Sequence, residues 1–568
     1  MAFSNVNNNF AHSLHSLIHV RAVGAENIVE DSFVSLPRNQ TIRNIGHNLV
    51  AKPPKEYFPV GHKEKVNKIS QALRNAVTPM DSLITIDTLQ RLSIDYHFEE
   101  EIQEALTREY GRIKAYNGRE VDCDLFHASL RFRLLRQEGY PVLSDVFKLF
   151  TDDKGKFRLQ LGKDIRGMMS LYEAAQFGVQ GEEILEEANA FTRAQLCASV
   201  AEHGDIQKGL SKMVMDTIAH PYNKTLPRFV TKQNIKTFDY GSINNGLLIE
   251  ELAKEDFGIV RSLYRTEISQ ISKWWSDLGL SKELKFARDQ PVKWYMWSVA
   301  TFADPRHSKQ RIELTKPISL IYVMDDIFDV YGTLDELVLF TDAINKWDLK
   351  AMETLPHQMK LVYRAVYDTT NEISHKVLGK HGWDPSNSLR KAWISLCNAF
   401  LVEAKWFASG YVPNAEEYLK NGIISSGVHV VFAHTFFLLG EGITKESIQL
   451  IDQTPSQVSS VAAILRLWDD LGSAEDENQE GYDGSYIECY MKDNRSCTLE
   501  GAREHVVGLI SNEWKRLNKE YCFSPNHLPK SFIKATFNFA RMVSLMYNYD
   551  NKQRLPSLEK YVNSMLYN

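Results

Sequence analysis

Three carboxylates interrupt an apolar and aromatic stretch in Ile321-Tyr322-Val323-Met324-Asp325-Asp326-Ile327-Phe328-Asp329-Val330-Tyr331. On an α-helix, Asp325 and Asp329 fall about 40° apart and Asp326 falls about 100° from Asp325. Acids on a mostly apolar helix are costly to bury as ions unless a cation compensates them, and hard divalent cations prefer carboxylate oxygens. The stretch therefore favours a metal site. The alternative is a solvated acidic turn, and the surrounding apolar residues argue against it.

A second acidic stretch follows in Arg466-Leu467-Trp468-Asp469-Asp470-Leu471-Gly472-Ser473-Ala474-Glu475-Asp476-Glu477. Asp469, Ser473 and Glu477 fall at about 0°, 40° and 80° around a helix, and Arg466 falls at about 60°. Oxygen ligands with a cation among them suit a metal ion that also holds an anion, as Mg²⁺ often does with substrate phosphates. Acids at this spacing are also common on solvated helices, so the two stretches together predict the site more strongly than either alone.

The two stretches resemble the metal motifs of the class I plant terpene synthases. Asp325-Asp326-Ile327-Phe328-Asp329 is similar to the aspartate-rich motif of that family, and Asp469, Ser473 and Glu477 match its second metal motif. The resemblance covers nearly all the chain from about residue 42 to the end. It continues through Leu89-Gln90-Arg91-Leu92, Phe132-Arg133-Leu134-Leu135-Arg136, Glu403-Ala404-Lys405-Trp406 and Glu488-Cys489-Tyr490-Met491.

The composition is that of a globular protein, with 43% hydrophobic and 24% charged residues, and a length of 568 residues favours two domains. Glycine (30) and proline (18) are few, which favours long helices over turn-rich sheets. A net charge of −6 argues against a nucleic-acid partner. The six cysteines show no CxxC spacing, which fits a reducing compartment and argues against a zinc site.

The resemblance implies an all-α fold with two helical domains. Residues 42–240 would form an N-terminal α-barrel relic, and residues 241–568 a C-terminal class I terpenoid synthase α-bundle that holds the metal. The first half is expected to have no chemistry of its own, because Asp122-Cys123-Asp124-Leu125 stops short of the DxDD motif of class II cyclases. The tandem arginine of the RRx8W element, common in cyclising monoterpene synthases, is also missing.

Residues 1–41 are expected to be a disordered tail or a weak transit peptide. No acid occurs before Glu26, as in a transit peptide, but serine and arginine are fewer than usual. The expected location is the plastid or the cytosol, with a slight preference for the plastid. The apolar run Gly427–Gly440 is too short to span a bilayer, so it predicts a buried core helix and no membrane partner.

The resemblance also implies residues that hold the diphosphate of a substrate. Arg288 and Arg466 would bind its oxygens, and Lys293 is a further candidate. The family usually carries a second arginine two residues after Arg288, but here that residue is Gln290, and Lys293 stands where many relatives carry glutamate. After the second metal motif, cyclising members commonly read Arg-Gly, whereas this chain reads Glu480-Gly481.

A pocket for the hydrocarbon is implied in the same way. Trp297 matches an aromatic residue that faces the carbocation in relatives, and Tyr547, with Asp550 shortly after it, matches the C-terminal lid. Ser425-Ser426-Gly427 matches a helix break that lines the pocket floor. Arg288, Trp297 and Tyr547 are therefore the predicted catalytic residues.

Three Mg²⁺ ions are implied as cofactors, with Mn²⁺ as an alternative. Asp325 and Asp329 would hold them from one side, and Asp469, Ser473 and Glu477 from the other. Asp326 would not touch the metal but would support the ligands from behind.

The departures from the family pattern resemble the synthases of acyclic terpene alcohols. Geranyl diphosphate would ionise and water would attack C3 to give linalool, and farnesyl diphosphate would give nerolidol by the same route. A cyclising mono- or sesquiterpene synthase is the enzymatic alternative, and a non-enzymatic helical scaffold is the remote one. A chain-elongating prenyltransferase is disfavoured because the second motif contains Ser473 and Glu477. The chain is expected to be a monomer or a weak dimer.

Overall fold

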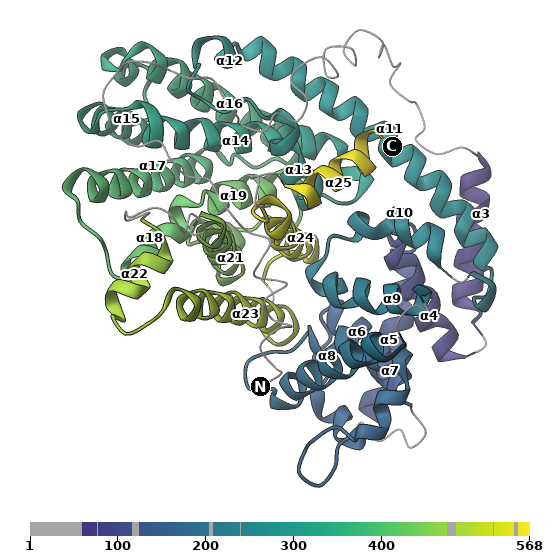
Figure 1. The fold of residues 1–568 in the computed structure, drawn as a ribbon. Coiled ribbons are helices and arrows are strands. Elements are labelled where there is room, and N and C mark those ends of the chain that lie inside the picture. Colours follow the sequence, from purple (N-terminus) through teal and green to yellow (C-terminus); the bar gives the residue numbers. More distant parts are fainter. Residues whose placement is uncertain are drawn as a thin grey trace. The chain divides into compact units, whose positions relative to one another are not determined.

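The computed structural model describes residues 60–76, 78–115, 124–203, 208–238, 240–473, 484–525, 527–549 and 555–567. Within these ranges the regular structure is helical, apart from one isolated bridge between Thr151 and Phe157 (Figure 1). The predicted all-α class is therefore confirmed. The chain divides into two compact units, which are described separately below.

The N-terminal unit comprises residues 53–262 and 515–526. Its core is made of leucine and phenylalanine side chains such as Leu89, Phe98, Leu134 and Phe147, all of which are fully buried. Its helices are α3 (Val60–Arg74), α4 (Pro79–Arg91), α5 (Glu99–Ala115), α6 (Leu125–Gln137), α7 (Ile165–Ala175), α8 (Glu183–His203), α9 (Lys208–Ala219), α10 (Pro227–Thr237) and the first part of α11 (Gly246–Leu278).

Two buried arginines on α6 belong to the motif Phe132-Arg133-Leu134-Leu135-Arg136, and they connect α6 to other segments of the N-terminal unit. Arg136 donates to the carbonyl of Val142 at 2.9 Å and to the Glu182 carboxylate at 2.8 Å. Arg133 pairs with Asp87 on α4. Both arginine side chains are almost completely buried. This motif therefore holds the N-terminal unit together.

The C-terminal unit contains the described residues of 263–514 and 527–567. After the end of α11, its α-helices are α12 (Leu280–Glu283), α13 (Pro291–Thr301), α14 (Ser308–Asp326), α15 (Leu334–Lys346), α16 (His357–His381), α17 (Ser386–Ser409), α18 (Ala415–Ser425), α19 (Val428–Leu439), α20 (Lys445–Asp452), α21 (Ser456–Ser473), α22 (Tyr486–Asp493), α23 (Leu499–Phe523), α24 (Lys530–Met546) and α25 (Pro556–Val562). The α23 residues beyond Trp514 belong to the N-terminal unit.

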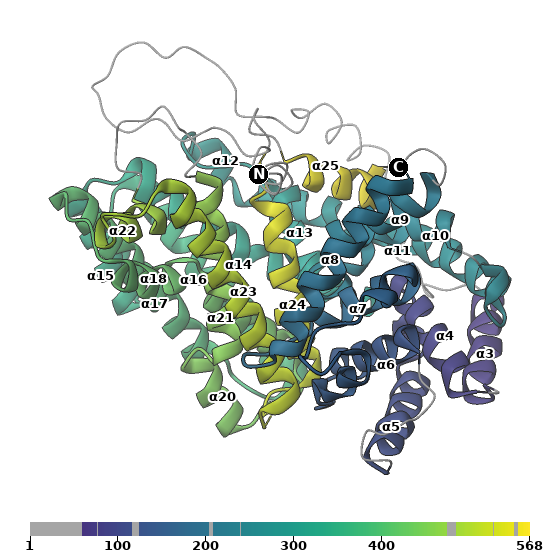
Figure 2. The same ribbon diagram turned by 60° about the horizontal axis from the view of Figure 1, so that its bottom comes forward.

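Helix α19 is the central element of the C-terminal unit. Every residue from Val428 to Leu439 is buried, and α14, α17, α21 and α24 pack against this helix (Figure 1). Figure 2 shows α21 and α24, which also pack on each other. The prediction of a buried core helix is therefore confirmed. By length and composition alone, Ala415–Leu439 could cross a membrane, but 83% of its most apolar window is buried inside the fold.

A buried ion pair fixes the start of α14 to the end of α11. Arg311 donates to both oxygens of Glu267, at 2.7 and 2.8 Å, and its side chain is completely buried. The same guanidinium donates to the carbonyls of Phe302, Asp304 and Pro305. All three nitrogens of the Arg311 guanidinium therefore donate hydrogen bonds. These bonds anchor the N-terminal end of α14, and the aspartate-rich motif lies at its C-terminal end.

Candidate active site

The aspartate-rich motif lies where α14 changes its hydrogen-bonding pattern. The α-helix ends at Asp326 and continues as the π-helix η8 (Ile327–Tyr331), in which the Gly332 N–H donates to the Ile327 carbonyl at 2.8 Å. The uniform 100° step used for the sequence therefore stops applying at Asp326. Asp325 is half-buried, Asp326 is buried and Asp329 is exposed. Short π-helical segments of this kind are frequent at functional sites.

Arg288 lies between the first two acids of this motif. Its backbone N–H donates to Asp326 Oδ2 at 2.7 Å, and its Nε lies 2.8 Å from Asp326 Oδ1. Its Nη2 pairs with Asp325, and the guanidinium lies 4.8 Å from the centre of the Tyr322 ring. Burial raises the pKa of the Asp326 carboxyl to about 6, although the charge of Arg288 opposes the rise. Arg288 thus connects the loop before α13 to the acids of α14.

Asp469 of the second motif interacts electrostatically with the first motif. Burial raises the pKa of Asp469, and the charge of Asp325 adds to the rise, while Arg466 and Arg288 oppose it. Arg466 Nη1 lies 3.5 Å from Asp469 Oδ2 on the same helix. Asp325 and Asp469 therefore act on each other from different helices. Carboxylates that disfavour each other's charge, with cations around them, fit a site for divalent metal ions and an anion.

Lys293 on α13 joins this group of charges. Burial and the nearby charge of Arg288 lower the pKa of Lys293 to about 8, and Asp469 opposes the fall. Of the predicted residues, the structure thus gathers Arg288, Lys293, Asp325, Arg466 and Asp469 in one electrostatic neighbourhood. Ser473 is the last residue of α21, but its side chain is outside the described part of the chain. Glu477, Glu480, Gly481 and Asp550 also lie outside the described residues.

The helix break expected at Ser425-Ser426-Gly427 is present. Helix α18 ends at Ser425, and Gly427 has φ of +72° before α19 begins. A Cβ on Gly427 would come within 2.8 Å of Ile321 Cγ2, so the break packs tightly against α14. Only a glycine adopts this backbone conformation without strain, and only a glycine fits this contact.

A hydrogen-bonded chain joins the break to the second metal motif. Ser425 Oγ donates to Glu403 Oε1 at 2.6 Å and accepts from Arg466 Nη2 at 3.1 Å. Asn421 donates to the same Glu403 oxygen at 3.0 Å. Burial raises the pKa of Glu403 although Arg466 opposes the rise. In the sequence, Glu403 was only part of a resembling motif. Its role in positioning Arg466 becomes visible only when α17, α18 and α21 pack together.

Aromatic side chains line the region beside these charges. Trp297 is buried, its ring stacks on Phe539 of α24 at 4.4 Å, and its Nε1 donates to the Tyr322 hydroxyl at 3.0 Å. The Tyr547 ring lies 6.5 Å from Trp297. Burial raises the pKa of Tyr547, and Tyr322 and Asp469 add to the rise. The structure thus brings the predicted Trp297 and Tyr547 together, and it adds Tyr322, which sequence reasoning missed as a site residue.

Asp470 is a second residue that the sequence analysis left without a role. It is buried, and it accepts hydrogen bonds from the Tyr418 hydroxyl at 2.9 Å and the Tyr486 N–H at 3.0 Å. Burial raises its pKa to about 7. Asp470 therefore connects α21 to α18 and α22, whereas its neighbour Asp469 interacts electrostatically with Asp325. A step of about 100° between consecutive helical residues is the signal that could have separated the two roles.

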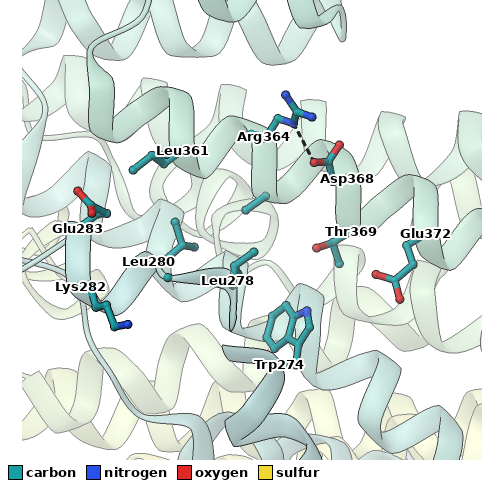
Figure 3. Close-up of a pocket in the computed structure, with 12 residues that line it drawn as sticks. Trp274, Leu278, Leu280, Lys282, Glu283, Leu361, Arg364, Asp368, Thr369 and Glu372 are labelled. Atoms are coloured by element: carbon teal, nitrogen blue, oxygen red, sulfur yellow. Dashed lines mark hydrogen bonds and ion pairs between the residues drawn. The ribbon is translucent and has the colours of Figure 1, made fainter. Parts of the chain in front are cut away.

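A surface pocket of about 440 Å³ lies elsewhere in the C-terminal unit, where α11 ends and α12 and α16 meet (Figure 3). Trp274, Leu278 and Leu361 line it together with the charged residues Lys282 and Glu372. None of the predicted site residues contributes to it. This pocket is therefore separate from the group of acids and cations described above.

Two family models match the chain. The model described as "Terpene synthase family, metal binding domain" matches residues 276–516, and "Terpene synthase, N-terminal domain" matches residues 31–218. Every candidate residue of the C-terminal unit described above, except Tyr547 and Phe539, falls within the first match.

Curated plant proteins are similar over most of their length. A probable terpene synthase 4 of Ricinus communis is 52% identical over 86% of both chains. An (E)-nerolidol synthase of Cannabis sativa is 48% identical over 89% of this chain and 92% of its own. The S-(+)-linalool synthase of Arabidopsis thaliana, named chloroplastic, is 44% identical over 93% and 92%. A chloroplastic tricyclene synthase of Antirrhinum majus is 45% identical over 90% and 87%.

Solved structures of terpene synthases have a similar fold. Isoprene synthase from grey poplar, in complex with three Mg²⁺ ions and dimethylallyl-S-thiolodiphosphate, has a TM-score of 0.81 at 33% identity and covers 90% of this chain and 97% of its own. Limonene synthase with 2-fluorolinalyl diphosphate has a TM-score of 0.85 at 31% identity, with coverages of 92% and 97%.

Proposed function

Because this chain belongs to the plant terpene synthase family, we propose that it ionises a prenyl diphosphate and lets water capture the cation. Geranyl diphosphate would give linalool, and farnesyl diphosphate would give nerolidol. The class I terpenoid synthase fold is confirmed by its likeness to the isoprene and limonene synthases. The chain is thus a lyase of the terpene synthase family, and the identity of its product is the proposal.

The observation that supports the proposal most is the grouping of Asp325 with Asp469 among Arg288, Lys293 and Arg466. Two acids from different helices supply oxygen ligands, and three cations supply donors for diphosphate oxygens. Asp329, Ser473 and Glu477 complete the proposed ligand set, with three Mg²⁺ ions as in the poplar structure and Mn²⁺ as a substitute. When bound, Mg²⁺ acts as a Lewis acid that stabilises the charge developing on the leaving group.

The residues of the chain divide the work around that charge. The diphosphate is hydrogen-bonded by Arg288, Arg466 and Lys293 while the carbon–oxygen bond breaks. The electron pair of that bond leaves with the diphosphate. The ring face of Trp297 attracts the allylic cation. Water then adds to C3 and loses a proton, so the net reaction is geranyl diphosphate plus water to linalool plus diphosphate. Residues around Tyr547, which lie against Gly472 of α21, limit the entry of further water.

The alcohol product is favoured by the residue two positions after Arg288, where the family usually carries a second arginine that binds diphosphate. We call this the clamp position. Gln290 occupies the position of the second arginine, and its Oε1 is buried without a hydrogen-bond partner among the described residues. A neutral amide holds diphosphate less firmly than a guanidinium. We infer that the leaving group is released before it can be recaptured and isomerised, which ring closure requires. The nerolidol and linalool synthases among the relatives agree with this product class.

A cyclising synthase is the second candidate, because the tricyclene synthase is as similar to this chain as the linalool synthase. The test is gas chromatography with mass spectrometry of products from geranyl and farnesyl diphosphate, with Mg²⁺ and the full chain. Acyclic tertiary alcohols should dominate in both reactions. A profile dominated by limonene or another ring compound would replace the proposal with the second candidate.

Plastid location is proposed from the relatives that are named chloroplastic, and the cytosol is the alternative. A fusion of residues 1–60 to a fluorescent protein, expressed in leaf cells, tests it. A monomer or weak dimer is proposed as the working form, and light scattering at assay concentration tests that.

A further inference from the structure

Two imidazoles and a carboxylate meet in the N-terminal unit, in residues that the proposed reaction does not use. His62 belongs to α3, His97 to the short helix η1 (Asp95–His97), and Asp256 to α11. The Nε2 atoms of His62 and His97 lie 3.3 Å apart, and His97 Nε2 lies 3.1 Å from Asp256 Oδ1. The three ligand atoms all lie within 4.8 Å of one another. The fold thus brings three metal-ligating side chains together from three separate segments.

The spacing of these atoms is that of ligands around one small cation. Atoms bound about 2.0–2.1 Å from a tetrahedral Zn²⁺ ion lie roughly 3.3 Å from one another. The separations of 3.3 and 3.1 Å match that value. Two imidazole nitrogens and a carboxylate oxygen are also an established protein ligand set for zinc. The third separation, between the ligand atoms of His62 and Asp256, is at most 4.8 Å.

The surroundings of His62 support the ligand role. Its other ring nitrogen, Nδ1, lies 3.5 Å from Glu255 Oε2, and Glu255 is itself paired with Lys65. A carboxylate beside the outer nitrogen favours the tautomer whose Nε2 lone pair is free for a metal.

Asp256 is held in place by two further contacts. The Tyr96 hydroxyl donates to its Oδ1, and Arg228 Nη1 lies 3.6 Å from its Oδ2. His62 and Asp256 are buried, whereas the His97 side chain is 11% exposed, so an ion and a water ligand would enter beside His97. The positive charge of Arg228 near Asp256 opposes the binding of a metal ion. The competing arrangement is a metal-free network of hydrogen bonds among the same residues.

We propose that His62, His97 and Asp256 bind one first-row divalent cation, with Zn²⁺ as the chosen probe. The ion would cross-link α3, η1 and α11 inside the N-terminal unit and would stabilise that unit. Its role is structural and does not depend on the proposed reaction. The cysteine pattern, which argued against a zinc site, could not reveal a site built from histidine and aspartate.

The test uses the full chain, freed of metal with a chelator, incubated with Zn²⁺, passed through gel filtration and analysed by mass spectrometry for bound zinc. The wild-type chain should retain one zinc per molecule, and H62Q and D256N should retain none. His127, a more exposed histidine on α6 with Asp124 beside it, offers a matched control, and H127Q should retain the ion. The double variant D325N/D469N should also retain it, which separates this site from the acids of the C-terminal unit.

Cobalt substitution of the wild-type chain gives a readout that needs no correctly folded variant. Bound Co²⁺ should show visible absorption bands typical of four-coordinate nitrogen and oxygen ligation, and Zn²⁺ should raise the midpoint of thermal unfolding by a few degrees. The proposal is overturned if the wild-type chain leaves gel filtration without zinc and shows no such cobalt bands. It is equally overturned if zinc is lost only from D325N/D469N. Either result would favour the hydrogen-bonded network.

Discussion

Arg288 holds Asp326 twice, through its backbone N–H at 2.7 Å and through its guanidinium Nε at 2.8 Å. The carboxylate of the middle acid in the motif is therefore directed at an arginine, while Asp325 is half-buried beside it. Asp326 is predicted to support the metal ligands without touching the metal, and these contacts lead us to propose that it does so by positioning Arg288. It also means that Arg288 shares its charge between these acids and any bound diphosphate.

Asp326→Asn should lower turnover by about ten- to a hundredfold, because one charge-assisted contact worth about 1.5–3 kcal/mol is lost from Arg288. The same change should strengthen inhibition by inorganic diphosphate, since Arg288 no longer neutralises a buried carboxylate. Steady-state kinetics with diphosphate as inhibitor measures both effects. Weaker inhibition together with unchanged turnover would mean that Asp326 does not restrain Arg288. Asp342→Asn on the exposed face of α15 is the control.

Asp325→Asn and Asp469→Asn should each lower turnover by at least about a thousandfold, because metal-held charge on the leaving group is expected to be the main source of catalysis. The folded state should persist in both variants, as judged by circular dichroism. Activity is measured at limiting Mg²⁺, where a weakened ligand has its largest effect. Near wild-type turnover in either variant would remove that residue from the ligand set.

Arg311→Met should destabilise the C-terminal unit by about 3–5 kcal/mol, because Glu267 would be left as an unpaired buried charge. The double change Arg311→Met with Glu267→Leu should recover a large part of that loss. Urea unfolding measures the difference. Arg364→Met, which breaks the exposed pair with Asp368, is the matched control and should leave the unfolding midpoint unchanged. Equal effects at the two arginines would contradict the argument from burial.

Stability should fall as the pH drops below about 6.5, in part because of two buried histidines on α19. Burial lowers the pKa of both His429 and His434 to about 4. Between pH 6.5 and 4 the unfolded chain binds protons on these histidines that the native state does not bind. Each histidine therefore lowers the free energy of unfolding by up to about 3 kcal/mol across that window. His434→Leu should flatten the decline, and His357→Gln, at an exposed position, should not. Urea midpoints at several pH values decide the matter.

Much of the fold could be predicted because it depends on local patterns. The helix over the aspartate-rich motif, the buried helix α19 and the break at Gly427 each follow from periodicity or from the resemblance. The π-helix after Asp326 could not be predicted, because a fixed angular step carries no information on where hydrogen bonding changes to i+5. Asp326, the last residue before that change, is buried, and Asp329, inside the π-helix, is exposed.

Contacts between distant segments were the other part that the sequence could not supply. Glu403, Ser425 and Arg466 form one hydrogen-bonded chain only because α17, α18 and α21 pack together. Asp470 directly follows the predicted ligand Asp469 in the sequence, yet it binds the Tyr418 hydroxyl and the Tyr486 N–H. Each of these roles depends on which neighbour fills the space next to the side chain, and residue spacing does not encode that neighbour.

The clamp position offers a direct test of why the product should be acyclic. Gln290→Arg should restore a charge-assisted contact with diphosphate, worth about 1.5–3 kcal/mol in favourable cases. The ion pair would then live longer after ionisation, which allows recapture at C3 and rotation to the cation from which six-membered rings close. A small rise in cyclic by-products, or tighter inhibition by inorganic diphosphate, is expected.

Lys293 complicates this test because it lies near Arg288 and Asp469 and can already supply the missing charge. Its pKa of about 8 means that part of that charge is lost in mildly alkaline buffer, so assays belong at or below pH 7. The double change Gln290→Arg with Lys293→Glu restores the residues found in many relatives and is the sharper comparison. If both variants leave product ratios and diphosphate inhibition unchanged, the clamp does not determine the product. The shape of the pocket around Trp297 and the break at Gly427 would then be the determinant to vary next.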